Sequence, residues 1–373
     1  MRVLHIGPVP PPYGGVAVTM DTVIIAERNL GTSCEVLDTS AHGSREVIGR
    51  ASLKDILRAA FVMMVLVGKL IKGKFDLVHI HSTDDVGFVR DAGLVEICAL
   101  FRKPVVLHIH GDLHTRVFPG NNAIFRSLFE RTRKRINGAV VLGHDIQRRL
   151  GETKSIVVPN PHTFSEKEIQ YLHNRKVPCD DGRPAKLLFI GRLSNEKGVF
   201  DFIRLVEALN MNGYMVEGIF AGTAPDAKDQ RAFDSAIKNK PFLKALGQVA
   251  GNSKVEVFHQ TDLLVFPSYK EILPVSVIEA LAAGVPAVVY DVGVVDSIVT
   301  HGVNGLVVTR GDEQALYDNV QALFEDRAHW ARLSANAKAA STALSSEEIV
   351  RQMMAFYGSI LADIKTGRLV EGR

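Results

Sequence analysis

Short apolar runs alternate with longer helical patterns along the first half of the chain. The apolar runs of this half are RVLHIG, CEVLD, DLVHIH, PVVLHIHG and GAVVLG. Continuous apolar strands favour a parallel sheet that is buried on both faces, and helices of amphipathic period between them supply the cover. The first half is therefore predicted to be an α/β unit.

A second series of the same kind follows. Its apolar runs are KLLFIGRL, YMVEGIFAG, DLLVFP, PAVVYD and GLVVTR, and long helical patterns begin at Glu313. Residues 160–185 lack strong periodicity and are rich in proline and polar groups, which is typical of a connector. A chain of 373 residues also suits two domains of ordinary size.

These patterns predict two Rossmann-like domains, each with a parallel sheet covered by helices, that face each other across a cleft. We expect the first domain at 1–165, a connector at 166–184, the second domain at 185–345, and a final helix at 346–373 that packs back toward the first domain. Ligands of such sheets bind outside the carboxyl ends of the strands, so the cleft is the predicted site.

Charge and cysteine content exclude several classes of protein. Lysine and arginine number 44 against 41 acidic residues, and a net charge of +3 does not indicate a nucleic-acid partner. Cys34, Cys98 and Cys179 have no ligand-like spacing, so neither a disulfide framework nor a zinc site is predicted. The chain enters an apolar strand at once, with no secretory leader pattern, which predicts a cytoplasmic protein.

Two segments bear on membrane contact. Residues 56–74 are strongly apolar, but the uninterrupted part, 59–67, is far shorter than the ~20 residues that a membrane span needs, so a buried helix is favoured and surface contact stays open. Residues 124–136, IFRSLFERTRKRI, form a basic amphipathic pattern that an anionic membrane would attract. A surface helix with solvated charges is the alternative. Lys69, Lys72 and Lys74 favour contact with the inner face of the cytoplasmic membrane.

Two glutamates follow the predicted strand that ends at Pro267. Glu271 and Glu279 are eight residues apart, slightly over two helical turns, so both carboxylates could face one ligand. Exposed charges on a helix face are the alternative interpretation, which spacing alone does not exclude.

Glycines and histidines follow strands of the first half. Gly14 and Gly15 stand before a helical pattern, where bare amides can hold an anion, although a simple turn has the same sequence. His108, His110, Asp112 and His114 are close together but lack partners at metal-ligand spacing elsewhere in the sequence, so no metal site is predicted. His110 is instead interpreted as a hydrogen-bonding group at a strand tip, or as a half-buried structural histidine.

Two cations lie in the loop after the first strand of the second half. Arg192 and Lys197 in FIGRLSNEKG precede a helical pattern, and their charge would add to the amides and dipole of the helix start to bind a diphosphate. Solvated loop charges would show the same local sequence.

Taken in order, these motifs resemble the retaining glycosyltransferases of family 4, which have the GT-B fold. The set comprises Gly14-Gly15, HIHGD, VPNP, FIGRLSNEKG, FPSYKEILPVSVIEALAAGVPAVV and HGVNGLVV. It spans nearly the whole chain, and the paired glutamates match the family's E-x7-E signature.

The resemblance implies roles for individual residues. Glu271 would contact the transferred sugar and Glu279 the ribose hydroxyls of the nucleotide, while Arg192 and Lys197 would bind the donor diphosphate. His110 would lie beside the reacting sugar. Gly14 and Gly15 would lie near the phosphate and acceptor, and the backbone amides around Leu273, Pro274 and Val275 would face the sugar or the β-phosphate.

This sequence departs from the family pattern at two places. Ile272 stands where a small residue is usual, and Gly222-Thr223-Ala224-Pro225 replaces the usual Gly-x-Gly-Pro loop. These departures leave the donor identity open.

The implied reaction moves a sugar from a nucleotide diphosphate sugar, with a UDP- or GDP-sugar expected, to a hydroxyl of a glycan or lipid-linked acceptor, with retained configuration. Because no Asp-x-Asp motif is present, no cofactor and no metal are expected for the transfer. The alternatives are a nucleotide-sugar epimerase or hydrolase of the same fold, and a catalytically silent, membrane-associated binding protein.

Overall fold

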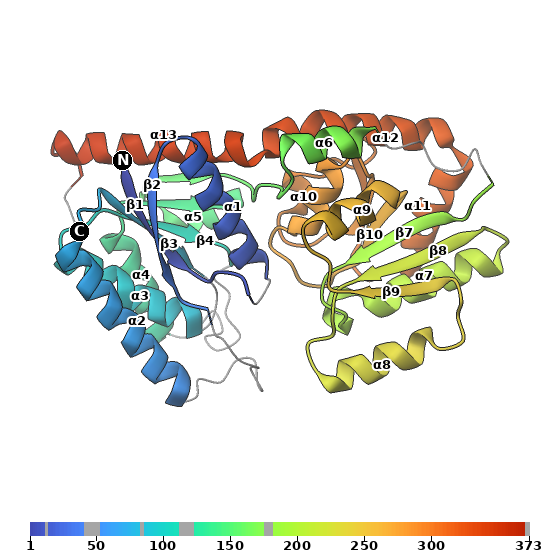
Figure 1. Cartoon of the computed structure of the whole chain (residues 1–373), viewed down its shortest axis with the longest axis horizontal. Helices are drawn as coiled ribbons and strands as arrows, with labels where there is room; N and C mark the ends of the chain where they lie inside the picture. The colour runs from blue at the N-terminus through green and yellow to red at the C-terminus, as the bar shows by residue number, and fades with distance from the viewer. Residues whose placement is uncertain (12–13, 41–52, 83–85, 112–122, 175–181, 370–373) are drawn as a thin grey trace. The chain divides into compact units, whose positions relative to one another are not determined.

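A computed structural model describes residues 1–11, 14–40, 53–82, 86–111, 123–174 and 182–369 (Figure 1). The chain forms two compact units. The first comprises Met1–Thr163 with Ser346–Arg373, and the second comprises Phe164–Ser345.

The first unit is built on a parallel sheet with the strand order β2-β1-β3-β4-β5-β6. Its strands are β1 (Arg2–Gly7), β2 (Ser33–Asp38), β3 (Leu77–Ser82), β4 (Val105–Ile109), β5 (Gly138–Val141) and β6 (Ser155–Val157). Its helices are α1 (Gly15–Asn29), α2 (Leu53–Lys72), α3 (Val86–Leu100), α4 (Ala123–Arg135), α5 (His144–Leu150) and α13 (Ser346–Lys365).

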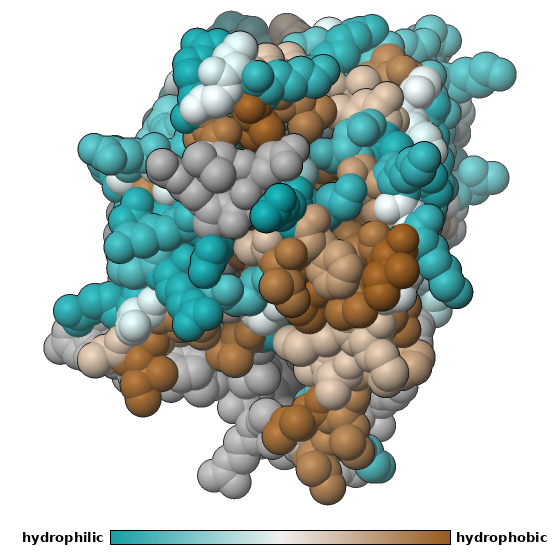
Figure 2. All heavy atoms as spheres, turned by 90° about the vertical axis from the view of Figure 1, so that its left-hand side faces the viewer, coloured by the Kyte–Doolittle hydropathy of each residue, from teal (hydrophilic) through white to brown (hydrophobic). Residues whose placement is uncertain are grey.

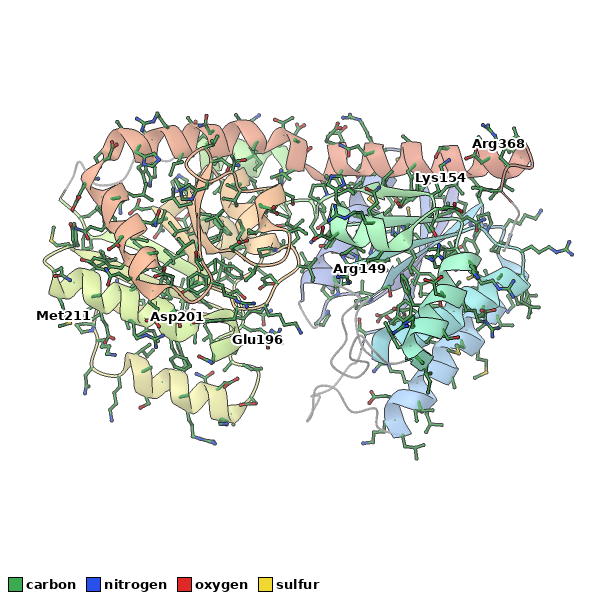
Figure 3. All side chains as sticks on the ribbon, turned by 180° about the vertical axis from the view of Figure 1, so that it is seen from behind. Arg149, Lys154, Glu196, Asp201, Met211 and Arg368 are labelled. Carbon is green, nitrogen blue, oxygen red and sulfur yellow. The ribbon has the colours of Figure 1, made fainter. Side chains whose placement is uncertain are left out.

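Helix α13 belongs to the first unit although it ends the chain. Its apolar face, which includes Met353 and Ile360, packs with Val3 of β1 and Val106 of β4 in one buried cluster. Lys154, labelled in Figure 3, adds an ion pair of 2.5 Å to Asp363 of the helix. A helical pattern that is distant in sequence thus completes the cover of the first sheet.

The second unit is also built on a parallel sheet, with the strand order β12-β11-β10-β7-β8-β9. Its strands are β7 (Ala185–Ile190), β8 (Val216–Ala221), β9 (Leu243–Gly247), β10 (Leu263–Phe266), β11 (Ala287–Tyr290) and β12 (Gly305–Val308). Its α-helices are α6 (Glu166–His173), α7 (Val199–Met211), α8 (Ala227–Ile237), α9 (Asn252–Gln260), α10 (Val275–Ala282), α11 (Glu313–Glu325) and α12 (Arg327–Ala340). Short 3-10 turns occur at η1 (Asn195–Lys197), η2 (Val295–Ser297) and η3 (Thr342–Leu344).

The segment predicted to be an irregular connector, 166–184, begins with helix α6. Ser165 caps this helix: its hydroxyl accepts from the Glu168 amide, and the Glu168 carboxylate accepts from the Ser165 amide. The Ser-x-x-Glu spacing was a usable signal for a helix start that the weak periodicity of the segment concealed.

Helix α2 is not the buried helix that its composition favoured. Its buried face consists of Val62, Leu66 and Leu70. A second apolar row is exposed: Leu53, Ile56, Leu57, Phe61, Met64 and Ile71. Figure 1 places α2 on the side of the first unit that Figure 2 turns toward the viewer, and brown apolar side chains gather on that face. Among the described helices, none has the length and apolar content to cross a membrane.

Candidate active site

Two loops at the carboxyl edge of the second sheet bring a lysine and a glutamate together. Strands β7 and β10 are parallel neighbours, so the loops that follow them leave the same edge of the sheet. Lys197 in the first loop forms an ion pair from Nζ to Oε1 of Glu271 in the second loop, and both side chains are largely buried. The sequence predicted both residues as site residues, and the fold brings them into contact.

Backbone packing holds these loops against each other. The Tyr269 amide donates to the Glu196 carbonyl at 3.0 Å, and Figure 3 labels Glu196 at this place. Gly198 has a φ of +75°, and a Cβ there would lie 1.8 Å from the Pro267 carbonyl oxygen. Only glycine permits this approach, so the Lys197–Glu271 contact depends on the glycine that follows the lysine.

Tyr269 is a supporting residue that the sequence did not reveal. Its hydroxyl donates to Asp201 of α7 at 2.7 Å, and Tyr290 donates to the same carboxylate oxygen at 2.9 Å. The hydrogen bond to Asp201, labelled in Figure 3, raises the pKa of Tyr269 to about 12. The buried carboxylate thus anchors the loop two residues before Glu271, and only the fold brings Asp201 to it.

Glu279 lies on the first turns of α10 and is 4% exposed. Its Oε1 accepts from Lys254 Nζ of helix α9 at 2.5 Å. Each signature glutamate therefore has a lysine of its own. Lys254 was missed because it lies in the first turn of the short helix α9 (Asn252–Gln260) with no motif around it.

The start of helix α10 carries the predicted backbone donors. Pro274 is the N-cap residue, and its carbonyl accepts from the amides of Val277 and Ile278. Because proline has no N–H, any backbone donors of this stretch come from the residues beside Pro274. Leu273 and Val275 retain amides at the helix start, where the dipole favours an anion.

Arg192 and the altered glycine loop lie beside this edge. Arg192 follows β7 by two residues and is exposed. Gly222 follows β8, and a Cβ there would lie 1.8 Å from the Gly191 carbonyl oxygen. Packing within the unit therefore requires a glycine at Gly222, the first residue of the altered loop, independently of any ligand.

The remaining predicted residues lie in the first unit. Gly14 caps helix α1 and Gly15 begins it, both are exposed, and a Cβ at either would have no atom within 4 Å. Packing against the described residues therefore does not demand glycine at either position. Asp112 and His114 lie outside the described residues.

His110 follows β4 and is almost buried, with 9% of its surface exposed. Its Nε2 lies 3.1 Å from Nδ1 of His81. Burial lowers the pKa of His110 to about 3, so its imidazole is neutral at physiological pH. It does not carry a charge there, and its proposed contact with a ligand stays a prediction.

A row of histidines extends from His110 into the sheet. His5, His79, His81 and His108 are buried on the face that α1 and α13 cover, because they share strand alternation with Val3, Leu77 and Val106 of the same core. Burial lowers the pKa of His79, His81 and His108 well below the usual range. From the sequence no partners were identified for His108 and His110, and in the structure the ring of His81 on β3 lies beside both.

Comparisons with known proteins show resemblance to glycosyltransferases. Residues 172–340 match the family model described as glycosyl transferases group 1. TuaC of Bacillus subtilis, named as a teichuronic acid biosynthesis glycosyltransferase, is 30% identical over 60% of this chain and 55% of its own length. The lipopolysaccharide core biosynthesis mannosyltransferase LpsB of Rhizobium meliloti is 30% identical over 46% of this chain and 50% of its own length. The chain thus matches about half the length of each of these two relatives.

Solved structures share the architecture. Anabaena Alr3699/HepE in complex with UDP-glucose has a TM-score of 0.69 at 20% identity and covers 96% of this chain and 100% of its own. The lipopolysaccharide outer core galactosyltransferase WaaB has a TM-score of 0.69 at 15% identity and covers 96% and 99%. Identities this low show the fold alone.

Residues 172–340 thus match the group 1 glycosyltransferases, and glycosyltransferases are the proteins that the chain resembles. The predicted fold class, two Rossmann-like units with parallel sheets as in the GT-B fold, is confirmed.

Proposed function

We propose that this protein transfers a sugar from a nucleotide diphosphate sugar to a hydroxyl group of a glycan or lipid-linked acceptor, with retained anomeric configuration. The observation that carries the proposal is the Lys197–Glu271 pair at the carboxyl ends of neighbouring strands. It supplies a cation for a phosphate and a carboxylate for a sugar hydroxyl within one contact.

The chemistry of this pair suits a diphosphate leaving group. An ammonium group has three donors, so Lys197 can bind a phosphate oxygen while it keeps its bond to Glu271. The contacts of Glu271 among the described residues, from Lys197 and from the Ser268 hydroxyl at 3.3 Å, fall on Oε1. The second oxygen, Oε2, is then the atom we assign to a sugar hydroxyl.

Arg192 and the amides at the start of α10 complete the proposed donor site. The exposed guanidinium of Arg192 and the helix dipole would stabilise the negative charge that grows on the leaving diphosphate. We expect these groups to do this without a metal ion at the diphosphate. Glu279 would accept hydrogen bonds from ribose hydroxyls, with Lys254 holding its carboxylate in place.

In the first unit, neutral His110 would bind the transferred sugar, and the amides beside Gly14 and Gly15 would approach phosphate or acceptor. A UDP-sugar is a reasonable first candidate donor, because Anabaena Alr3699/HepE has been crystallised with UDP-glucose. The printed names of TuaC and LpsB suggest polysaccharide biosynthesis as the setting.

We also propose that the first unit binds an anionic membrane surface, which suits a lipid-linked acceptor. On α2, the exposed residues Leu53, Leu57, Phe61, Met64 and Ile71 recur three, four or seven residues apart and so share one face. The cations Lys54, Arg58 and Lys72 lie on the same helix, whose Lys69 pairs with Glu35 at 3.1 Å. An exposed apolar face flanked by cations is the pattern of an interfacial helix.

Helix α4, the segment first predicted to make this contact, supports it less. Arg131 and Arg135 pair with Glu96 at 2.6 and 3.6 Å, and Arg133 pairs with Glu130 at 2.6 Å. These internal partners reduce the charge available to lipid. We therefore place the main contact on α2.

The reaction is tested by following anomeric configuration. Purified protein is incubated with a UDP- or GDP-sugar and a membrane lipid extract, and nuclear magnetic resonance reports the anomer of the new linkage. Retained configuration in an acceptor-dependent product supports the proposal. Inversion, or release of free sugar at the same rate without acceptor, would contradict it and favour another mechanism or a hydrolase.

A further inference from the structure

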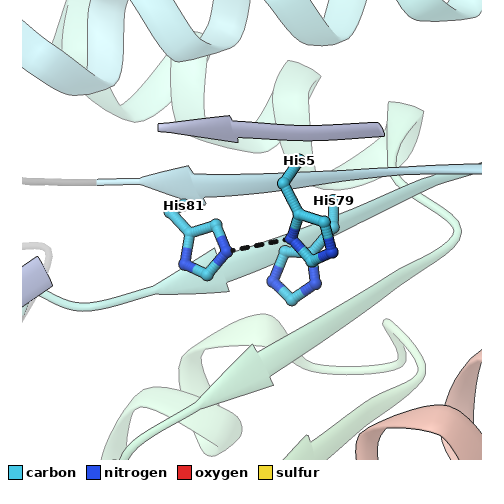
Figure 4. A group of neighbouring side chains, drawn as sticks. All are labelled: His5, His79 and His81. Carbon is cyan, nitrogen blue, oxygen red and sulfur yellow. Dashed lines mark hydrogen bonds between the residues drawn. The ribbon is translucent and has the colours of Figure 1, made fainter. Parts of the chain in front are cut away.

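We propose that the first unit binds a divalent transition-metal ion, with Zn²⁺ as the expected class, through His5, His79 and His81 (Figure 4). The three side chains are fully buried, and one nitrogen from each lies within 4.8 Å of the others. His5 comes from β1, and His79 and His81 come from the adjacent strand β3. This site is separate from the metal-independent transfer proposed above.

Each of the three imidazoles has one nitrogen engaged by an outer partner. His5 Nε2 lies 2.9 Å from the Glu27 carboxylate, His79 Nδ1 bonds the Tyr357 hydroxyl, and His81 Nδ1 lies 3.1 Å from His110 Nε2. Histidine ligands of metal ions almost always have such a partner on the other ring nitrogen, because it fixes ring orientation and tautomer.

The opposite nitrogens are then left for an ion. His5 Nδ1 and His81 Nε2 are 3.4 Å apart, which is about the separation of two nitrogens that bind one tetrahedral Zn²⁺ at roughly 2.0–2.1 Å. His79 Nε2 is buried and has no hydrogen-bond partner among the described residues. An unpaired buried acceptor is costly, and coordination would remove that cost.

Proton positions agree with this assignment. If His5 and His79 donate outward to Glu27 and Tyr357, their inner nitrogens carry lone pairs. The Tyr357 hydroxyl donates a hydrogen bond to the Glu27 carboxylate at 3.2 Å, and the Cys34 thiol donates to the same carboxylate at 3.1 Å. Glu27 therefore acts as an ionised acceptor.

Imidazole nitrogen suits Zn²⁺, Co²⁺ and Ni²⁺, and three such ligands leave a fourth position for water. The alternative to a metal ion between His5 and His81 is a proton on His5 that hydrogen-bonds His81. The two differ in metal content, so they can be separated directly.

The first test measures metal in the full-length chain. Protein produced with added Zn²⁺ or Co²⁺ is freed of loose metal by gel filtration and analysed by mass spectrometry and visible absorption. We expect a stoichiometric ion and the absorption of tetrahedral nitrogen-bound Co²⁺. Metal far below stoichiometry, with no such absorption, would overturn the proposal whatever the variants do.

The second test locates the ion. His79→Gln is expected to lower metal occupancy by roughly tenfold or more, and Tyr357→Phe, which removes an outer partner, to weaken binding by about 10- to 100-fold. His108→Gln is the matched buried control, and exposed His301→Gln controls for surface binding. Loss of metal in His108→Gln with retention in His79→Gln would move the ion elsewhere and overturn the assignment. Far-ultraviolet circular dichroism checks that each variant is folded.

Discussion

The ammonium group of Lys197 pairs with the carboxylate of Glu271, and this pair joins the loops that follow the neighbouring strands β7 and β10. Lys197→Met removes the cation from the proposed phosphate contact and leaves Glu271 without its lysine. We expect kcat/KM for the donor to fall more than tenfold, as loss of a charged contact worth over ~1.4 kcal/mol implies. Lys270→Met, at an exposed neighbouring position, is the matched control for steady-state kinetics. A wild-type rate in folded Lys197→Met would remove the assignment.

The pair between Lys254 and Glu279 is nearly buried, with side chains 16% and 5% exposed. Removal of one partner leaves a buried charge uncompensated, so Lys254→Met should lower the free energy of unfolding by about 3 kcal/mol. The double variant Lys254→Met/Glu279→Gln removes both charges and should recover most of that loss. Urea unfolding of the two single variants and the double variant measures the coupling. Additive losses would show that the two side chains do not support each other.

Gly198 is needed for close packing of the two active-site loops. Gly198→Ala should destabilise the chain by roughly 3 kcal/mol or more, because its Cβ would clash with the Pro267 carbonyl in addition to straining the backbone. Gly213→Ala isolates the backbone effect: its φ is +88°, but a Cβ there meets no neighbour within 4 Å. We expect a loss of about 1 kcal/mol at that site. Equal urea midpoints for the two variants would contradict the packing argument.

The exposed apolar face of α2 predicts membrane binding. Phe61→Glu places a charge where an apolar ring, 61% exposed in the structure, would enter the lipid surface. Binding to vesicles with phosphatidylglycerol should fall about tenfold or more, since burial of a phenylalanine contributes roughly 1.5–3 kcal/mol. Met211→Glu makes the same kind of change at an exposed position of the second unit. Unchanged cosedimentation of Phe61→Glu, or an equal loss in Met211→Glu, would remove α2 as the contact.

The strand and helix pattern was sufficient to predict both parallel sheets, because apolar runs of strand length are a local property of the sequence. Glu271 and Lys197 were predicted as site residues for a related reason. Each follows a recognisable strand, and the carboxyl ends of parallel strands lie at the same edge of a sheet. Lys254 and Asp201 were missed because both lie within helices and nothing around them marks a site.

One prediction was wrong and one contact was overlooked, each for a physical reason. A helix of apolar composition such as α2 can have one apolar face toward the core and another toward solvent, and composition does not separate the two. The histidines were judged one strand at a time, whereas strand pairing places His5 beside His79. The order of strands in a sheet, which decides such contacts, is not a local property.

The central claim is that the second unit binds a nucleotide diphosphate sugar through Glu279 and its neighbours. The most direct measurement is calorimetric titration of UDP-, GDP-, ADP- and dTDP-sugars into wild type and Glu279→Ala, in buffer without divalent cations. The account predicts binding of one nucleotide class by wild type and at least about tenfold weaker binding by the folded variant. Binding of no class, or equal binding by both proteins, would contradict it.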